Sequence, residues 1–184
     1  MALPDRIEGL AIVSDDGMIA DASRNQPDAL KIPADQRYFR RTHDPAAALV
    51  HGKNSGEGGP DAARRTRLIL TRGIAGLAPV PGEPRATLWN PAGAPLGEAW
   101  DALGLSGGLL AVIGGTGPFG EFLDRYDAFH LSRAEGARLP GGVPVFPGIP
   151  PASPEDLLTR HGLKPDPAQA LDAAAGLVLT VWRR

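Results

Sequence analysis

The sequence contains no cysteine among its 184 residues. This absence excludes disulfides, thiolate metal sites and catalysis by a cysteine nucleophile. The chain also lacks an excess of charge of one sign, since 19 Lys and Arg residues stand against 21 Asp and Glu residues. The near balance argues against a general binder of nucleic acid or of anionic membranes, and it leaves room for a local basic pocket.

Long apolar runs are missing as well. The run at 109–113 is among the longest and is far too short to span a bilayer, and residues 1–6 show no basic region followed by an apolar stretch. The four histidines form no H-E-x-x-H pattern, so we assign no metal. No G-x-S-x-G elbow, in which the serine stands between a strand and a following helix, supports a hydrolase. We expect a soluble, cytoplasmic protein that binds neither nucleic acid nor membrane, as a monomer or homodimer.

Short apolar runs alternate with loops and short helical segments, which is typical of an α/β protein. No repeat or dividing linker is visible, so we expect a single domain over 1–184 with a sizeable core. The expected strands cover 7–14, 47–51, 67–71, 85–89, 109–113, 128–133 and 177–182. The expected helices cover 33–42, 95–103, 118–126 and 153–162. Glycine- or proline-rich loops are expected at 52–60, 75–84 and 140–151.

The segment from Leu109 to Gly120 predicts a strand, a glycine turn and a helix. Glycines let the backbone approach a ligand closely, and a helix N-terminus offers free N–H groups that suit a phosphate. Residues 115–120 also match the G-x-G-x-x-G dinucleotide pattern, although no clear βαβ unit with a ribose-binding acid carries it. A tight turn in a glycine-rich protein explains the same pattern, so both interpretations stay open at this point.

A carboxylate, that of Asp35, falls in the first turn of the helix that Pro33 opens. An acid at this position suits the helix dipole, and this structural reason is sufficient by itself. A functional interpretation requires Asp35 to face inward, near Phe39 one turn later.

Taken together and in this order, these segments resemble the dihydrofolate reductase family over roughly residues 7–150. Pro33-Ala34-Asp35 followed by Phe39 is similar to the family's helix with the catalytic acid. The run at 112–116 followed by Phe119 is similar to its strand and double-glycine turn. The segments 122–127, 130–132 and 143–147 are similar to the family's later helix, strand and Phe-Pro segment. The resemblance implies a three-layer α/β/α fold with a central mixed, mostly parallel sheet and a C-terminal antiparallel edge.

The resemblance also implies an activity, the NADPH-dependent reduction of 7,8-dihydrofolate to tetrahydrofolate. The hydride would go to C6 of the pterin, with protonation at N5. Asp35 would be the catalytic residue, bonded to the amino-pyrimidine edge of the pterin. The residues implied for the substrate are Ala11, Ile12, Phe39, Arg65, Ile113 and Ser132. The residues implied for NADPH are Ile19, Gly52, Lys53, Asn54, Ser55, Thr71, Arg72, Gly114, Gly115, Thr116, Gly117 and Phe119.

Several of these roles rest on charge or on hydrogen bonding. Ser132 would support the acid, and Arg65 would pair with the glutamate tail of folate, since a guanidinium matches a carboxylate. Lys53, Thr71 and Arg72 would lie beside the 2′-phosphate, which favours NADPH over NADH. Lys53 and Arg72 are equally compatible with being ordinary surface charges. The basic run 64–67 is compatible with an edge strand whose charges prevent it from pairing with another chain.

Three features depart from the family. Leu30 stands where a Trp is usual, the loop at 23–31 is longer than in compact members, and residues 54–59 lack the usual pattern. Dihydromethanopterin reductase, which acts on another pterin, fits these departures. The segment 15–20 is similar to the S-x-D-G-x-I-A segment of riboflavin-pathway pyrimidine reductases, which lack the acid of the P-A-D helix. A non-catalytic pterin- or nucleotide-binding module is the alternative from another class, and the presence of Asp35 counts against it.

Overall fold

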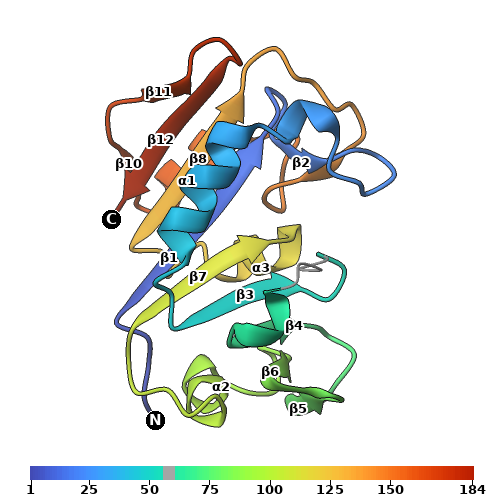
Figure 1. Ribbon diagram of the computed structural model, residues 1–184, viewed down its shortest axis with the longest axis vertical. Coiled ribbons are helices and arrows are strands. Elements are labelled where there is room, and N and C mark those ends of the chain that lie inside the picture. The colour runs from blue at the N-terminus through green and yellow to red at the C-terminus, as the bar shows by residue number, and fades with distance from the viewer. Residues whose placement is uncertain (56–60) are drawn as a thin grey trace.

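A ten-stranded mixed sheet with helices on both faces dominates the computed structural model (Figure 1). The structure describes residues 1–55 and 61–184, so residues 56–60 of the expected loop at 52–60 lie outside the described residues. The strands of the described chain are β1 (Arg6–Val13), β2 (Met18–Ala20), β3 (Ala48–Gly52), β4 (Arg67–Leu70), β5 (Leu77–Val80), β6 (Glu83–Trp89), β7 (Leu109–Gly114), β8 (Ala128–Ala134), β9 (Val143–Pro144), β10 (Lys164–Pro165), β11 (Gln169–Asp172) and β12 (Leu177–Arg183).

The helices are short. They are α1 (Pro33–His43), α2 (Leu96–Ala102), α3 (Thr116–Glu121) and α4 (Pro154–Arg160), with 3-10 turns η1 (Asp28–Leu30) and η2 (Ala62–Arg64). The longest helix, α1, has 11 residues, and none of the described helices combines the length and apolarity that crossing a bilayer requires.

The large sheet is parallel in its middle and antiparallel at its edges. Its strand order is β10, β12, β8, β1, β7, β3, β4, β6 and β5, with β11 paired to β12. The strand β1 pairs in parallel with β7 and β8, β3 with β7 and β4, and β4 with β6. The pairs β8–β12 and β5–β6 are antiparallel. This arrangement confirms the predicted mixed, mostly parallel sheet with a C-terminal antiparallel edge.

The core lies on both faces of the sheet, because successive side chains of a strand point to opposite sides. The largest apolar cluster occupies one face and includes Trp100 of α2, Phe119 of α3 and Leu158 of α4. The opposite face is covered by α1, whose Phe39 packs in a smaller cluster with Leu10 of β1. The layers are therefore α/β/α, with α1 on one side of the central strands and α2, α3 and α4 on the other.

Most expected elements are confirmed. The seven expected strands correspond to β1, β3, β4, β6, β7, β8 and β12, and the expected helices at 33–42, 95–103 and 153–162 to α1, α2 and α4, with ends differing by at most two residues. The start of α4 was readable because Ser153 caps it, since its hydroxyl accepts the amide N–H of Asp156 at 3.0 Å.

The expectation of a plain connection at 75–84 is wrong. Leu77–Val80 forms β5 and pairs antiparallel with β6, and Gly82 adopts φ +76 in the turn between them. Pro79 argues against a strand in the sequence, because proline has no N–H to donate to a neighbouring strand. It is tolerated here because β5 is an edge strand.

Two other boundaries need correction. The helix expected at 118–126 begins earlier, at Thr116, because Gly115 has φ +90 and forms its N-cap, and it ends at Glu121. The loop expected at 140–151 contains β9, which pairs with β2. This pairing brings two segments that are distant in sequence to the same side of the molecule.

Candidate active site

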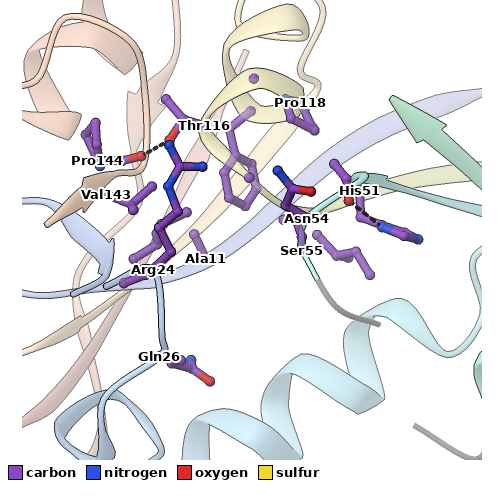
Figure 2. A pocket seen from close by; sticks show the side chains of 18 of the residues that line it. Ala11, Arg24, Gln26, His51, Asn54, Ser55, Thr116, Pro118, Val143 and Pro144 are labelled. Atoms are coloured by element: carbon purple, nitrogen blue, oxygen red, sulfur yellow. Dashed lines mark hydrogen bonds between the residues drawn. The ribbon is translucent and has the colours of Figure 1, made fainter. Parts of the chain in front are cut away.

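A cleft of about 1470 Å³ opens at the carboxyl ends of β1, β7, β3 and β4 (Figure 2). Ligands of open α/β sheets bind in crevices of this kind. The loop at 20–26, one face of α1 and the segment 141–144 complete its walls. All of the predicted site residues line this cleft except Arg65 and Ser132.

Asp35 lies at the α1 end of the cleft. Its side chain is turned inward, is 8% exposed and is hydrogen-bonded to Ser132 of β8. Burial raises the pKa of Asp35 above its ordinary value, and the hydrogen bond with Ser132 opposes this rise. The carboxyl therefore has the inward orientation that a functional interpretation requires.

A row of hydrogen-bonded side chains near Asp35 links α1 to strands β8 and β1. The Tyr38 hydroxyl lies 2.6 Å from Nδ1 of His130, and Nε2 of His130 lies 3.1 Å from the Glu8 carboxylate. Glu8 also pairs with Arg6 at 2.5 Å. The hydrogen bond with His130 is the main cause that lowers the pKa of Glu8, and burial opposes it. His130 thus bridges Tyr38 and Glu8, with one ring nitrogen within hydrogen-bond distance of each.

Apolar side chains surround the Asp35 end of the cleft. Ile12, Leu30, Phe39 and Ile113 line it, and Leu30 is only 1% exposed. Leu30 therefore occupies the wall where the resemblance leads one to expect a Trp. One carboxyl among apolar walls suits a flat heteroaromatic ring that carries N–H donors.

The double glycine has a structural reason. A Cβ added at Gly115 would lie 2.9 Å from Oγ of Ser55, and one added at Gly114 would lie 3.1 Å from Cβ of Ser55. The glycine turn and the residues that follow β3 therefore pack directly on each other. At Gly117, by contrast, an added Cβ would meet nothing within 4 Å apart from its chain neighbours and the backbone of its own helix. The tight-turn interpretation thus accounts for Gly114 and Gly115, and the space beside Gly117 is open.

Positive charge exceeds negative charge in the cleft. Among its described lining residues, Arg24, Arg40, Lys53 and Arg72 are cationic, and Asp35 is the one carboxylic acid. The cleft therefore suits an anionic ligand.

The end of the cleft formed by the residues that follow β3 and β4 suits NADPH, the cofactor that the resemblance implies. Lys53 and Ser55 follow β3, and Thr71 and Arg72 follow β4, across the sheet from the Asp35–Ser132 pair on α1 and β8. Cations and hydroxyls without a described carboxylate among them form a donor set that matches phosphate oxygens. These residues would bind the phosphates of NADPH.

Arg65 requires a correction. Its guanidinium pairs with Asp44 at 2.6 Å and lies outside the lining of the main cleft. It lines a second hollow of about 400 Å³, together with Arg64 and Arg85. The physical reason is that η2 and the start of β4 direct Arg65 toward the end of α1. Ser132 also lies outside the lining, but its bond to Asp35 matches the supporting role implied for it.

Sequence reasoning missed several residues of the cleft. Arg40 could have been found, since it follows Gln36 by one helical turn on the same face of α1 as the acid. Arg24 lies in a loop without periodicity, and Val143 and Pro144 reach the cleft through the pairing of β9 with β2. No local sequence signal marks that pairing.

Comparisons with known proteins identify no family by sequence. No family model matches the chain, and no curated protein matches it. Similar solved structures are found, each below 25% identity.

A protein from Shewanella sp. PV-4, provisionally named a riboflavin biosynthesis protein, is 22% identical with a TM-score of 0.67, over 97% of this chain and 98% of its own. Dihydrofolate reductase from Enterococcus faecalis, in complex with NADP(H), is 14% identical with a TM-score of 0.65, over 100% and 99%. A deaminase and 5-amino-6-(5-phosphoribosylamino)uracil reductase from Thermotoga maritima is 15% identical with a TM-score of 0.62, over 98% of this chain and 56% of its own. The chain therefore has a dihydrofolate reductase-like fold.

Proposed function

We propose that this protein is an NADPH-dependent reductase of a dihydropterin, with reduction of 7,8-dihydrofolate to tetrahydrofolate as the leading activity. The observation that carries the proposal is the buried carboxyl of Asp35, turned into the end of a cleft of about 1470 Å³. That volume exceeds the roughly 1,000 Å³ upper range of single small-ligand pockets, so a substrate and a cofactor can share it.

Asp35 would bind the substrate ring and support its reduction. A carboxylate among apolar walls accepts paired N–H donors from an amino-pyrimidine edge and stabilises positive charge that develops on the ring. Ser132 fixes the carboxyl, while Phe39 and Leu30 exclude water. Because the pKa of Asp35 is raised, its carboxyl keeps a proton to higher pH than an exposed aspartate does. Reduction also takes up a proton at N5, and this need for a proton is why we expect the reaction to slow as pH rises, although the ionised form of Asp35 is the one that stabilises charge on the ring.

Residues at the other end of the cleft would select the cofactor. NADPH, when bound, would supply the hydride for C6 of the pterin while a proton reaches N5. Lys53 and Arg72 would bind the 2′-phosphate, and the Thr71 hydroxyl would donate to it. The open space beside Gly117 admits a pyrophosphate close to the backbone.

A riboflavin-pathway pyrimidine reductase is the second candidate. The Ser14 hydroxyl bonds the Asp16 carboxylate at 2.5 Å, and that carboxylate also accepts the amide N–H of Leu139. Together with Gly17 at φ +80, these bonds shape a turn that carries Ile19 to the cleft. One of the similar structures is provisionally named a riboflavin biosynthesis protein and another a 5-amino-6-(5-phosphoribosylamino)uracil reductase, which supports this alternative for the substrate.

A substrate comparison tests the proposal. The protein is mixed with NADPH and, in turn, with 7,8-dihydrofolate, a dihydromethanopterin and the phosphoribosyl pyrimidine of riboflavin synthesis, and the loss of NADPH absorbance is followed. We expect rapid oxidation with one dihydropterin. Oxidation with the pyrimidine alone would assign the second candidate. No oxidation with any of them, alongside tight pterin binding, would identify a non-catalytic binding module and refute the reductase proposal.

A further inference from the structure

Arg24, one of the cations that line the cleft, has an unusual backbone conformation. The Arg24 residue has φ +66 and is the one non-glycine residue in the described chain with a positive φ. This left-handed conformation costs an L-residue about 1 kcal/mol or more, and such strain persists where surrounding contacts over-determine it. The strain alone proves nothing, so the contacts around Arg24 and the direction of its side chain decide its meaning.

The turn around Arg24 is closed by its own hydrogen bonds. The Asp21 carboxylate accepts the amide N–H groups of Ser23 at 2.8 Å and Asn25 at 2.9 Å. The Asp21 carbonyl accepts the N–H of Arg24 at 2.9 Å, and the Asp21 N–H donates to the Asn25 carbonyl, also at 2.9 Å. Both amide N–H groups bond Oδ1 of Asp21, which holds this carboxylate within the turn, and no ion pair joins it to the Arg24 guanidinium among the described residues. The turn thus fixes the backbone of Arg24 and leaves its charge unpaired.

The guanidinium itself is directed into the cleft. Arg24 lines the cleft, and within the described part of the chain its side chain has no hydrogen bond or ion pair. Other arginines are engaged in ion pairs: Arg65 is bonded to Asp44 and Arg133 to Glu155. Figure 2 shows Gln26 beside α1 and Arg24 extending away from α1, toward Thr116 and Pro144. Its charge is therefore presented at the glycine-turn side of the cleft rather than at the Asp35 side.

We infer that Arg24 binds a phosphoryl group of the ligand that lies beside the glycine turn. A planar guanidinium forms paired hydrogen bonds with phosphate oxygens, and the described lining residues near it, Thr116, Val143 and Pro144, bring no competing acid. The inference rests on the proposed function for the identity of the ligand. Two sources supply the same chemistry, the pyrophosphate of NADPH and the phosphate of a phosphoribosyl pyrimidine substrate.

The test measures binding, so that it does not depend on turnover. Dissociation constants are measured by calorimetry for NADPH, for the phosphoribosyl pyrimidine and for 7,8-dihydrofolate, which has carboxylates but no phosphate. The variants are Arg24→Gln, Arg24→Lys and Arg24→Gly, with Arg37→Gln as matched control because Arg37 is exposed on α1 outside the cleft. Arg24→Gly removes the charge but accepts a positive φ without strain.

We expect Arg24→Gln and Arg24→Gly to weaken one phosphate-bearing probe by about tenfold, and Arg24→Lys and Arg37→Gln to change it much less. Weaker binding of NADPH identifies the cofactor pyrophosphate as the partner, and weaker binding of the pyrimidine alone identifies the substrate phosphate. The inference is overturned if only dihydrofolate binding changes, if Arg24→Gly keeps full affinity, or if Arg24→Gln behaves like Arg37→Gln. Failure of the reductase proposal is separate, because it appears as absent turnover in the wild-type protein.

Discussion

The two ends of the cleft are built in different ways. At the α1 end, Asp35 is buried, bonded to Ser132 and backed by the chain from Tyr38 through His130 to Glu8. At the other end, the side chains that would meet phosphates lie on short segments that follow β3 and β4, and those of Lys53 and Arg72 have no ion pair among the described residues. The α1 end therefore resembles a preorganised site, in which Asp35 and the polar groups behind it already have hydrogen-bond partners.

This difference indicates that the α1 end of the cleft serves catalysis and the opposite end serves ligand binding. A buried carboxyl whose geometry is fixed by strands can act on a ring at one defined position, because small displacements cost catalysis. Exposed cations act through charge over a longer distance, so that their individual positions matter less. Changes at the α1 end should therefore alter turnover or folding, and changes at the phosphate end should alter affinity.

The largest effect is expected from Asp35→Asn. An amide keeps the shape of the side chain but cannot carry the negative charge, so we expect turnover with the preferred dihydropterin to fall about 100-fold or more. The affinity for NADPH, measured by fluorescence titration, should change less than about twofold. Asp28→Asn is the matched control, because Asp28 lies in η1 just before α1 and its side chain is 98% exposed. Equal turnover in the two variants would remove Asp35 from the catalytic role.

The next effect is expected at the opposite end, from replacing Lys53 and Arg72 together by Gln. The loss of two cations should weaken NADPH binding by about 10- to 100-fold, since each charge-assisted bond contributes on the order of 1 kcal/mol or more. NADH lacks the 2′-phosphate, and its affinity should change little. Arg64→Gln, on the second hollow, serves as the control. If NADH binding falls as much as NADPH binding, these residues do not select the 2′-phosphate.

The fold could be predicted from the sequence where local pattern and long-range packing agree. The run at 109–113 is apolar throughout because β7 lies between β1 and β3 and is covered on both faces. Proline at the start of α1 and serine before α4 marked helix beginnings, because each meets a need of the first turn. Such signals depend only on neighbouring residues, so they can be recognised without knowing which distant segments pack together.

The site was less predictable because it depends on which distant segments meet. Asp35 in a first helical turn has a sufficient structural explanation, and only the packing of α1 on β8 shows that it faces Ser132. The resemblance implies that Arg65 binds a substrate tail, but the structure pairs Arg65 with Asp44 at the end of α1. The pairing of β9 with β2 places Val143 in the cleft, and no local sequence pattern predicts this pairing.

A moderate effect on stability is expected from Glu8→Gln. This change removes the charge that His130 and Arg6 share, and we expect the free energy of unfolding at pH 7 to fall by about 1–2 kcal/mol. The pKa of Glu8 is lowered in the folded protein, so its contribution is present above the ordinary pKa of 4.5 and is lost as pH falls through the folded value. Urea titrations should therefore show the difference from wild type shrinking in acid. Binding of NADPH, at the other end, should not change.

The smallest effect is expected from Asp35→Asn again, this time on stability and with the opposite sign. The pKa of Asp35 is raised in the folded protein, so the folded state binds more protons than the unfolded state between the ordinary value of 3.8 and the folded value, and stability falls as pH rises across that range. An amide avoids the burial of a charge, so the variant should melt at a higher temperature than wild type at pH 7. The gain should disappear below about pH 3.8, where both side chains are neutral. Two buried acids on one side of the sheet would then respond to neutralisation in opposite directions, as a structural acid and a functional acid should. Melting curves that show destabilisation by both changes at pH 7 would mean that Asp35, like Glu8, serves the fold.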